Sequence, residues 1–120
     1  MKLSLVSIEK AGPIRVAADG LITAEDFDSE GVNPLASLLG ETWSNNNVLL
    51  DLSHVTYIDS SAIGWLISCH RGFKSGGGRF IVHSIQPAVK QILDMLRIGQ
   101  VVSLAEDETA ARALLNGAAP

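Results

Sequence analysis

Short apolar runs alternate along the chain with longer segments in which apolar residues recur at helical spacing. The clearest run, Val-Leu-Leu-Asp-Leu at residues 48–52, is typical of a strand that is buried on both faces. Two further runs, at residues 79–83 and 101–104, are separated from it and from each other by helical patterns. Because strands that alternate with helices usually pair in parallel, this order predicts an α/β fold with parallel core strands.

The first part of the chain indicates a hairpin instead of a strand–helix unit. Two runs rich in apolar residues, at residues 3–8 and 14–22, are separated by the turn signal Gly12-Pro13. The two strands are therefore expected to pair with each other ahead of the parallel part of the sheet.

Residue patterns typical of helices lie between the predicted strands and after the last one. Asn33-Pro34 predicts a helix start with proline in the first helical position, and apolar spacing continues that helix to Trp43. Pro87 opens another helix, which we expect Gly99 to end. The acidic residues 106–108 favour a last helix start. Along the predicted helix at residues 60–73, one side, expected to face the sheet, collects Ile63, Leu66, Ile67, His70 and Phe73. The helix at residues 87–98 collects Val89, Ile92, Leu93 and Leu96 on one face.

Length and composition fit one globular domain over residues 1–120, with 47% hydrophobic and 18% charged residues. No apolar run approaches the roughly 20 residues that a transmembrane helix needs, and the N-terminus has no signal-peptide core. The single cysteine, Cys69, excludes an internal disulfide. We therefore expect a soluble cytoplasmic protein with no membrane partner.

Charge and residue pattern argue against several classes of function. A net charge of −4 without a basic cluster gives no source for phosphate neutralisation, so nucleic acid is not an expected partner. The three histidines lie on different predicted elements, which does not favour a metal site. Neither Ser60 nor Cys69 has a nearby base in the sequence, and the glycines at residues 76–78 are interpreted as a helix stop. We expect no enzyme, no cofactor and no metal.

The most informative segment runs from the buried strand to Asp59-Ser60-Ser61 at the start of a helix. Ser60 in this position can cap the free amides of the first turn. A helix start also favours a negative charge by roughly 0.3–1 kcal/mol, so the free domain would tolerate a phosphate on Ser60. Against one partner carboxylate at ~4 Å, each unit charge of that phosphate would cost on the order of 4 kcal/mol. Phosphorylation is therefore expected to oppose docking more than folding.

At these residues the chain resembles the STAS family of anti-sigma factor antagonists. The resemblance rests on Asp59-Ser60-Ser61-Ala62-Ile63-Gly64 and the preceding strand, and extends to residues 20–23, 77–80, 89–96 and Ala110. It implies a mixed sheet of about five strands with an N-terminal hairpin and with helices packed mainly on one face. Two features depart from the family pattern: Ala62 replaces a common glycine, and residues 24–43 look longer and more irregular than a single helix.

The resemblance also implies a function. Unphosphorylated antagonists of this bacterial family bind an anti-sigma factor serine kinase and free a sigma factor. The kinase phosphorylates the serine after the aspartate, here Ser60, and a phosphatase removes the phosphate. The partner-binding residues that this implies are Asp59, Ser60, Ser61, Ile63, Gly64 and Trp65.

Alternatives remain open at three points. Trp65 is either exposed, as a hot spot beside the switch, or packed under the helix that contains Leu35 and Trp43. Asp59 either forms the local turn or helps to orient Ser60 or the metal-bound nucleotide of a kinase. The whole domain could instead be an unphosphorylated scaffold, or a module that senses a small ligand or nucleotide in a surface cleft.

Overall fold

The computed structural model describes residues 1–27 and 31–116. The strands are β1 (Lys2–Ile8), β2 (Ile14–Ile22), β3 (Asn47–Ile58), β4 (Arg79–His83) and β5 (Ser103–Ala105). The α-helices are α1 (Pro34–Leu39), α2 (Ser60–Gly76), α3 (Pro87–Met95) and α4 (Glu108–Leu115). Single turns of 3₁₀ helix, η1 (Ala24–Asp26), η2 (Trp43–Asn45) and η3 (Ile98–Gln100), join them.

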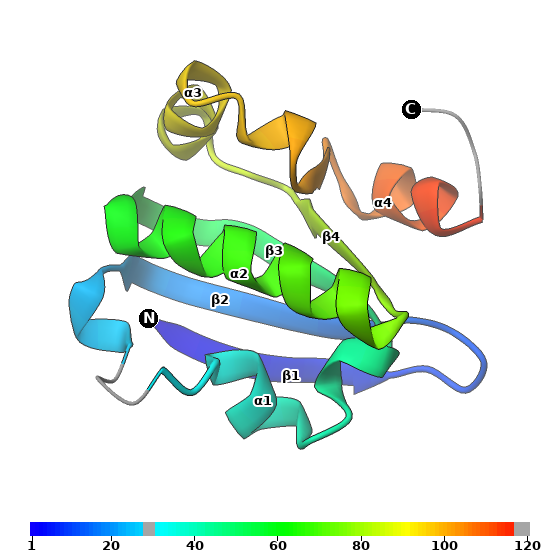
Figure 1. Cartoon of the computed structure of the whole chain (residues 1–120). Coiled ribbons are helices and arrows are strands. Elements are labelled where there is room, and N and C mark those ends of the chain that lie inside the picture. Colours follow the sequence, from blue (N-terminus) through cyan, green and yellow to red (C-terminus); the bar gives the residue numbers. More distant parts are fainter. Residues whose placement is uncertain (28–30, 117–120) are drawn as a thin grey trace.

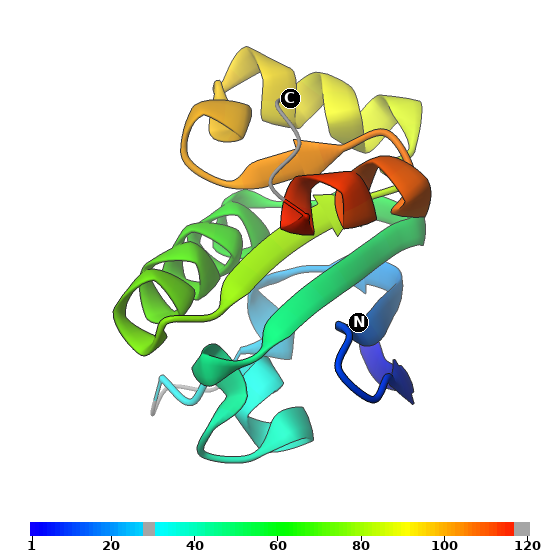
Figure 2. The same cartoon turned by 90° about the vertical axis from the view of Figure 1, so that its right-hand side faces the viewer.

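The strands of this part of the chain form one sheet in the order β1-β2-β3-β4-β5. The β1–β2 pair is antiparallel and the other three pairs are parallel, which confirms the predicted hairpin and mixed sheet. Figure 1 shows α2 packed against one face of the sheet and running along the strands, and Figure 2 shows α4 on the opposite face from α2. Helices α1, α2 and α3 share the α2 face because each belongs to a crossover between parallel strands.

Alternation along β3 divides the core between the two faces of the sheet. Val48 and Leu50 join the large cluster beneath α1, α2 and α3. Leu49 joins a small cluster with Ile81 and Ala111 beneath α4. The prediction of a strand buried on both faces is therefore confirmed for residues 48–52.

An ion-pair network also holds α4 to the hairpin. Arg112 Nη1 donates to Glu9 Oε1 over 3.0 Å, and Arg112 Nε donates to Glu108 Oε2 over 3.0 Å. The other Glu108 oxygen accepts from Arg15 Nε over 2.9 Å. The hydrogen bond from Arg112 holds the pKa of the Glu9 carboxyl below its ordinary value.

Several predicted boundaries were wrong. Helix α1 ends at Leu39, because Gly40 adopts a positive φ of 89°, and Trp43 starts a separate turn. Helix α3 ends at Met95 and does not continue to Gly99, since the backbone of Arg97 is in the left-handed region with φ 55°. Strand β3 continues to Ile58, and β5 has only three residues.

The predicted inner faces of α2 and α3 need correction as well. Leu66 and Phe73 of α2 are buried as predicted, whereas Ile63, Ile67 and His70 are only half-buried. Ala62, Trp65 and Cys69 are buried instead. The reason is that α2 is covered on a second flank by the irregular segment before β3, so its buried face is rotated away from the expected one. Leu96, predicted on the inner face of α3, is 55% exposed because it follows the last residue of that helix.

Within residues 1–27 and 31–116, no helix is long and apolar enough to cross a membrane.

Candidate functional site

The start of α2 is fixed by Asp59, the residue between β3 and the helix. Its Oδ1 accepts hydrogen bonds from the amides of Ser61 over 2.9 Å and Ala62 over 3.1 Å. Asp59 is therefore the N-cap, and the expectation that Ser60 caps the helix is wrong. The physical reason is that Asp59 has extended backbone angles, whereas Ser60 is already the first helical residue.

Asp59 also ties the helix start to the end of β2. Its Oδ2 accepts from the amide of Ala24 over 3.0 Å, and its own amide donates to the carbonyl of Ile22 over 3.2 Å. The carboxylate thus accepts three amide hydrogens, which accounts for the turn role that the sequence left open. This arrangement holds η1 beside the first turn of α2.

The side chains of the first two turns are presented to solvent to different degrees. Ser60 and Gly64 are exposed, while Ser61 and Ile63 are half-buried. No hydrogen bond to the Ser60 hydroxyl occurs within the described part of the chain. The hydroxyl therefore lies free at the positive end of a 17-residue helix, where added negative charge is favourable.

Trp65 is buried, with 5% of its surface exposed, so the alternative of an exposed aromatic was wrong. Its indole Nε1 donates to Asn33 Oδ1 over 3.0 Å, and its ring packs against Phe27 with centroids 5.7 Å apart. The alternative that Trp65 packs under the helix containing Leu35 was closer to the structure, because Trp65 packs against the N-terminus of α1. Helical angle alone could not decide this, since the covering segment comes from elsewhere in the sequence.

Asn33 connects α1 and α2 and was not singled out as part of the site. Its Oδ1 caps α1 by accepting from Leu35 N over 2.9 Å, in addition to the Trp65 bond. Its Nδ2 donates to Cys69 Sγ over 3.5 Å. The Asn-Pro signal identified the cap, but no sequence signal pointed to the indole or the thiol. Burial raises the pKa of the Cys69 thiol to about 12.

A hollow of about 310 Å³ opens between α2 and the segment before α1, and we refer to it as the α2 hollow. All of the described residues that line it are uncharged: Phe27, Gly31, Val32, Asn33, Pro34, Ser61, Gly64, Trp65 and Ser68. Ser61 and Gly64 place its mouth within one helical turn of Ser60.

Two glycines of α2 differ in what their missing side chains allow. A Cβ at Gly72 would overlap the ring of Trp43, so the close packing of η2 on α2 requires glycine there. A Cβ at Gly64 would meet nothing within 4 Å, and Gly64 has ordinary helical backbone angles. Glycine in a helix interior costs about 1 kcal/mol relative to alanine. The fold explains this cost at Gly72 but not at Gly64.

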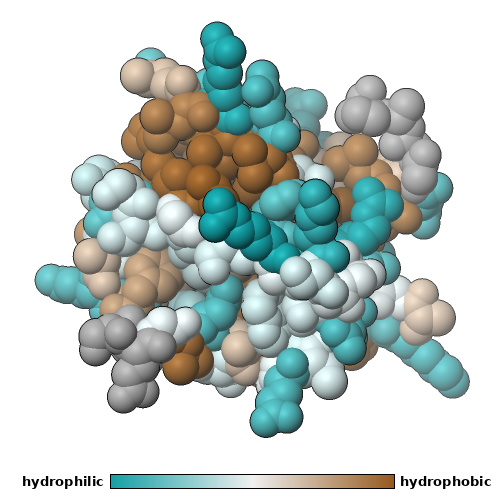
Figure 3. Space-filling model, in the orientation of Figure 1, coloured by the Kyte–Doolittle hydropathy of each residue, from teal (hydrophilic) through white to brown (hydrophobic). Residues whose placement is uncertain are grey.

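Apolar side chains also gather on the surface beyond α2. Met95, Leu96 and Val101 are 75%, 55% and 44% exposed. Figure 3 shows a hydrophobic area over α3 and the turn that follows it, above α2 in this view. Exposed apolar surface of this kind is typical of a protein-interaction face.

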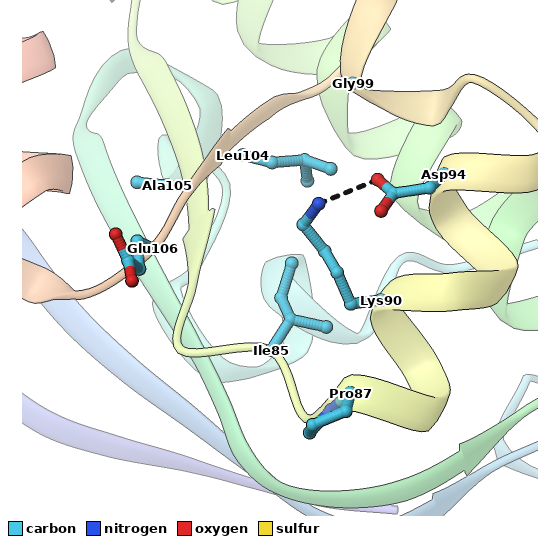
Figure 4. Close-up of a pocket in the computed structure, with 8 residues that line it drawn as sticks. All are labelled: Ile85, Pro87, Lys90, Asp94, Gly99, Leu104, Ala105 and Glu106. Carbon is cyan, nitrogen blue, oxygen red and sulfur yellow. Dashed lines mark hydrogen bonds and ion pairs between the residues drawn. The ribbon is translucent and has the colours of Figure 1, made fainter.

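A second and larger cavity, about 690 Å³, lies between α3 and the end of β5. Ile85, Pro87 and Leu104 supply apolar walls (Figure 4). Lys90 Nζ donates to Asp94 Oδ1 over 2.7 Å, so these two charges already satisfy each other. This α3–β5 cleft is in the size range of small-molecule sites.

A family model and several solved structures match this chain. The family model described as the STAS domain matches residues 15–111. An anti-sigma-factor antagonist (STAS) domain protein from Planctomyces limnophilus has a similar structure, with a TM-score of 0.71, 19% identity, and coverage of 95% of this chain and 97% of that one. The anti-sigma factor antagonist SpoIIAA in its unphosphorylated form matches with a TM-score of 0.67, 16% identity, and coverage of 99% and 100%. A putative anti-sigma factor antagonist from Thermotoga maritima matches with a TM-score of 0.62, 19% identity, and coverage of 85% and 87%.

Proposed function

The chain belongs to the STAS domain family, and on that premise we propose that it is an anti-sigma factor antagonist whose docking on an anti-sigma factor kinase is controlled by phosphorylation of Ser60. It acts without catalysis, as a bacterial cytoplasmic regulator formed by a single domain. A protein phosphatase restores the unphosphorylated form. The structural neighbours named as antagonists support this role.

The proposal rests on the exposure of Ser60 and on the fact that Ser60 does not cap the helix. Its side chain is exposed at the first position of α2, and Asp59 has already taken over the capping of that helix. A modifying enzyme can therefore reach the hydroxyl, and the fold does not need it for any hydrogen bond that the described residues make. This combination suits a switch better than a structural cap.

Electrostatics favour an effect on docking over an effect on folding. A phosphate on Ser60 would bring about −1.5 to −2 charges to a helix start, which stabilises the free domain by roughly 0.3–1 kcal/mol. A facing carboxylate at ~4 Å would cost on the order of 4 kcal/mol for each charge pair. A difference of that size lowers affinity by about a thousandfold.

The docking surface in this proposal centres on Ser60 and includes the exposed Gly64 and the half-buried Ser61 and Ile63. Asp59 contributes by positioning the first turn, because its carboxylate is engaged by three amides. Trp65 contributes from beneath, as a wall of the α2 hollow.

The test is phosphorylation by the anti-sigma factor kinase of the same organism, followed by intact-mass and fragment analysis. The wild type should gain one phosphate, located on Ser60. Ser61→Ala is the matched control and should still be modified, whereas Ser60→Ala should not. Phosphate on Ser61 alone, or no phosphate on the wild type, would reject the proposed switch.

A second candidate function, sensing of a small ligand, is favoured by the α3–β5 cleft. Its volume and apolar walls fit a small molecule, and the exposed Glu106 at its edge disfavours a phosphate-rich one. Calorimetric titration with nucleotides and with small organic cations tests ligand sensing against phosphorylation-controlled switching. Binding that is lost in Glu106→Lys, together with no phosphorylation of Ser60, would support sensing instead of switching.

A further inference from the structure

We infer that the kinase contacts the domain at a second place, the exposed end of α3, where one carboxylate of the kinase pairs with Arg97. We call this surface the α3 patch, and it consists of Arg97 and the exposed apolar residues Met95, Leu96 and Val101. The inference rests on the proposed function, because it takes the kinase that docks over Ser60 as the partner. It assigns the patch an occupant: a segment of the kinase in which apolar side chains surround a carboxylate.

The backbone of Arg97 has a conformation that arginine does not favour. Its φ of 55° and ψ of 37° lie in the left-handed region, directly after Leu96, the C-cap of α3. Glycine is the usual residue at such a position, because it has no Cβ that would clash there. Within residues 1–27 and 31–116, no hydrogen bond or ion pair of the Arg97 side chain offsets this strain. A contact made outside the isolated domain would explain why arginine occupies the position.

The charge of Arg97 selects the chemistry of the partner. Its side chain is exposed, and it follows the exposed apolar residues Met95 and Leu96 directly in the chain. The acidic residue before them, Asp94, accepts a hydrogen bond from Lys90 Nζ over 2.7 Å, so the Asp94 charge is already balanced. A planar guanidinium pairs best with a carboxylate, through two parallel hydrogen bonds. The α3 patch therefore fits an acidic side chain that is flanked by apolar ones.

The α3 patch lies on the same side of the sheet as the docking surface around Ser60. Figures 1 and 2 both show the end of α3 on the α2 side of the sheet and above α2, and Figure 3 shows the hydrophobic area there. Ile63, which belongs to the docking surface, and Ile92 of α3 are both half-buried and pack against the same core cluster. Partly exposed apolar side chains thus occur on both helices, so a kinase seated over Ser60 is placed to cover the patch as well.

Charge disfavours two other occupants of the α3 patch. In a two-fold dimer centred on the patch, Arg97 would face Arg97 of the second copy, and like charges repel each other. An anionic lipid surface attracts clusters of several cations, whereas this chain has a net charge of −4 and the patch holds one arginine. A protein partner that brings its own carboxylate matches the patch best.

The experiment measures the affinity of the unphosphorylated protein for the kinase, by calorimetry, together with the urea midpoint. Arg97→Gly should raise the urea midpoint, because glycine accepts a positive φ, and yet weaken binding about threefold or more. Arg97→Glu should weaken binding about tenfold or more, because it places a carboxylate against the kinase carboxylate. Leu96→Ser should weaken binding about threefold or more through the loss of apolar contact.

The matched control is Lys10→Glu, which makes the same change of charge at an exposed residue in the hairpin turn. It should alter affinity less than about twofold, since charges far from an interface are screened by salt. Salt also distinguishes an ion pair from a structural effect. Affinity of the wild type should fall as salt is added, and Arg97→Gly should reduce this dependence while Leu96→Ser keeps it. Equal salt dependence of Arg97→Gly and the wild type would overturn the ion pair.

The outcomes separate this inference from the proposed function. If phosphorylation of Ser60 abolishes binding while Arg97→Glu and Leu96→Ser bind as the wild type does, only this inference fails. If the wild type does not bind the kinase at all, both fail. If Arg97→Glu loses binding only because it unfolds, Arg97→Gly decides, since full affinity in that variant would overturn the inference. A dimer of the free domain that dissociates in Leu96→Ser, with kinase affinity unchanged, would assign the patch to a second copy instead.

Discussion

Asp59 should contribute more to stability than an ordinary helix cap. Removing an N-cap costs typically about 1 kcal/mol. The additional bond from Ala24 N to Oδ2 is exposed, so its loss should add about 0.5–1 kcal/mol. Asp59→Ala should therefore lower the free energy of unfolding by about 2 kcal/mol. At a urea slope of about 1–3 kcal/mol/M, the midpoint falls by roughly 0.7–2 M.

Two comparison variants separate these contributions. Asp59→Asn keeps an oxygen for Ser61 and Ala62 but loses the acceptor for Ala24, so it should cost about 0.5–1 kcal/mol. Asp107 caps α4 through one bond, from Ala110 N over 2.8 Å, and Asp107→Ala should cost about 1 kcal/mol. Urea titrations followed by circular dichroism give all three values. The reasoning is refuted if Asp59→Ala is no more destabilising than Asp107→Ala.

Three further predictions concern other parts of the fold. Gly72→Ala should destabilise by about 1–3 kcal/mol because its Cβ overlaps Trp43, and an unchanged urea midpoint would contradict this. The folded pKa of Glu9 lies below the ordinary value of 4.5, so its stabilising effect is present above about pH 4.5 and is lost as the pH falls through the folded pKa. In urea titrations between pH 3 and 7, Arg112→Gln should flatten that dependence, and an equally steep profile would argue against the ion pair. Cys69, with a pKa raised to about 12, should resist a thiol reagent at pH 8 until the protein unfolds, and fast labelling of the folded protein would disprove its burial.

The mixed sheet was predictable because its signals are local. The turn at Gly12-Pro13 and the strand at residues 48–52 each carry enough information within a few residues, and β4 was predicted with its observed boundaries. Asn33-Pro34 likewise located the start of α1. The helical spacing of apolar residues after Asp59 likewise located the start of α2 at Ser60.

What the sequence could not supply depends on contacts between distant segments. The burial of Trp65 follows from Asn33 and Phe27, which lie more than thirty residues away and belong to a segment with no regular pattern. The sequence did not show that Asp59 is the N-cap instead of Ser60, because both residue types cap helices equally well and only the backbone angles distinguish them. The α2 hollow could not be predicted, since its walls come from α2 and from the segment before α1, and the sequence does not show that these two segments lie side by side.

The central claim is that a phosphate on Ser60 blocks docking and leaves the fold intact. The most direct measurement compares the unphosphorylated and the Ser60-phosphorylated protein for affinity to the kinase and for urea midpoint. The claim predicts an affinity loss of about a thousandfold, from an unfavourable charge pair on the order of 4 kcal/mol, with an equal or slightly higher midpoint. Equal affinity of the two forms, or a phosphorylated form that binds poorly because it has unfolded, would contradict it.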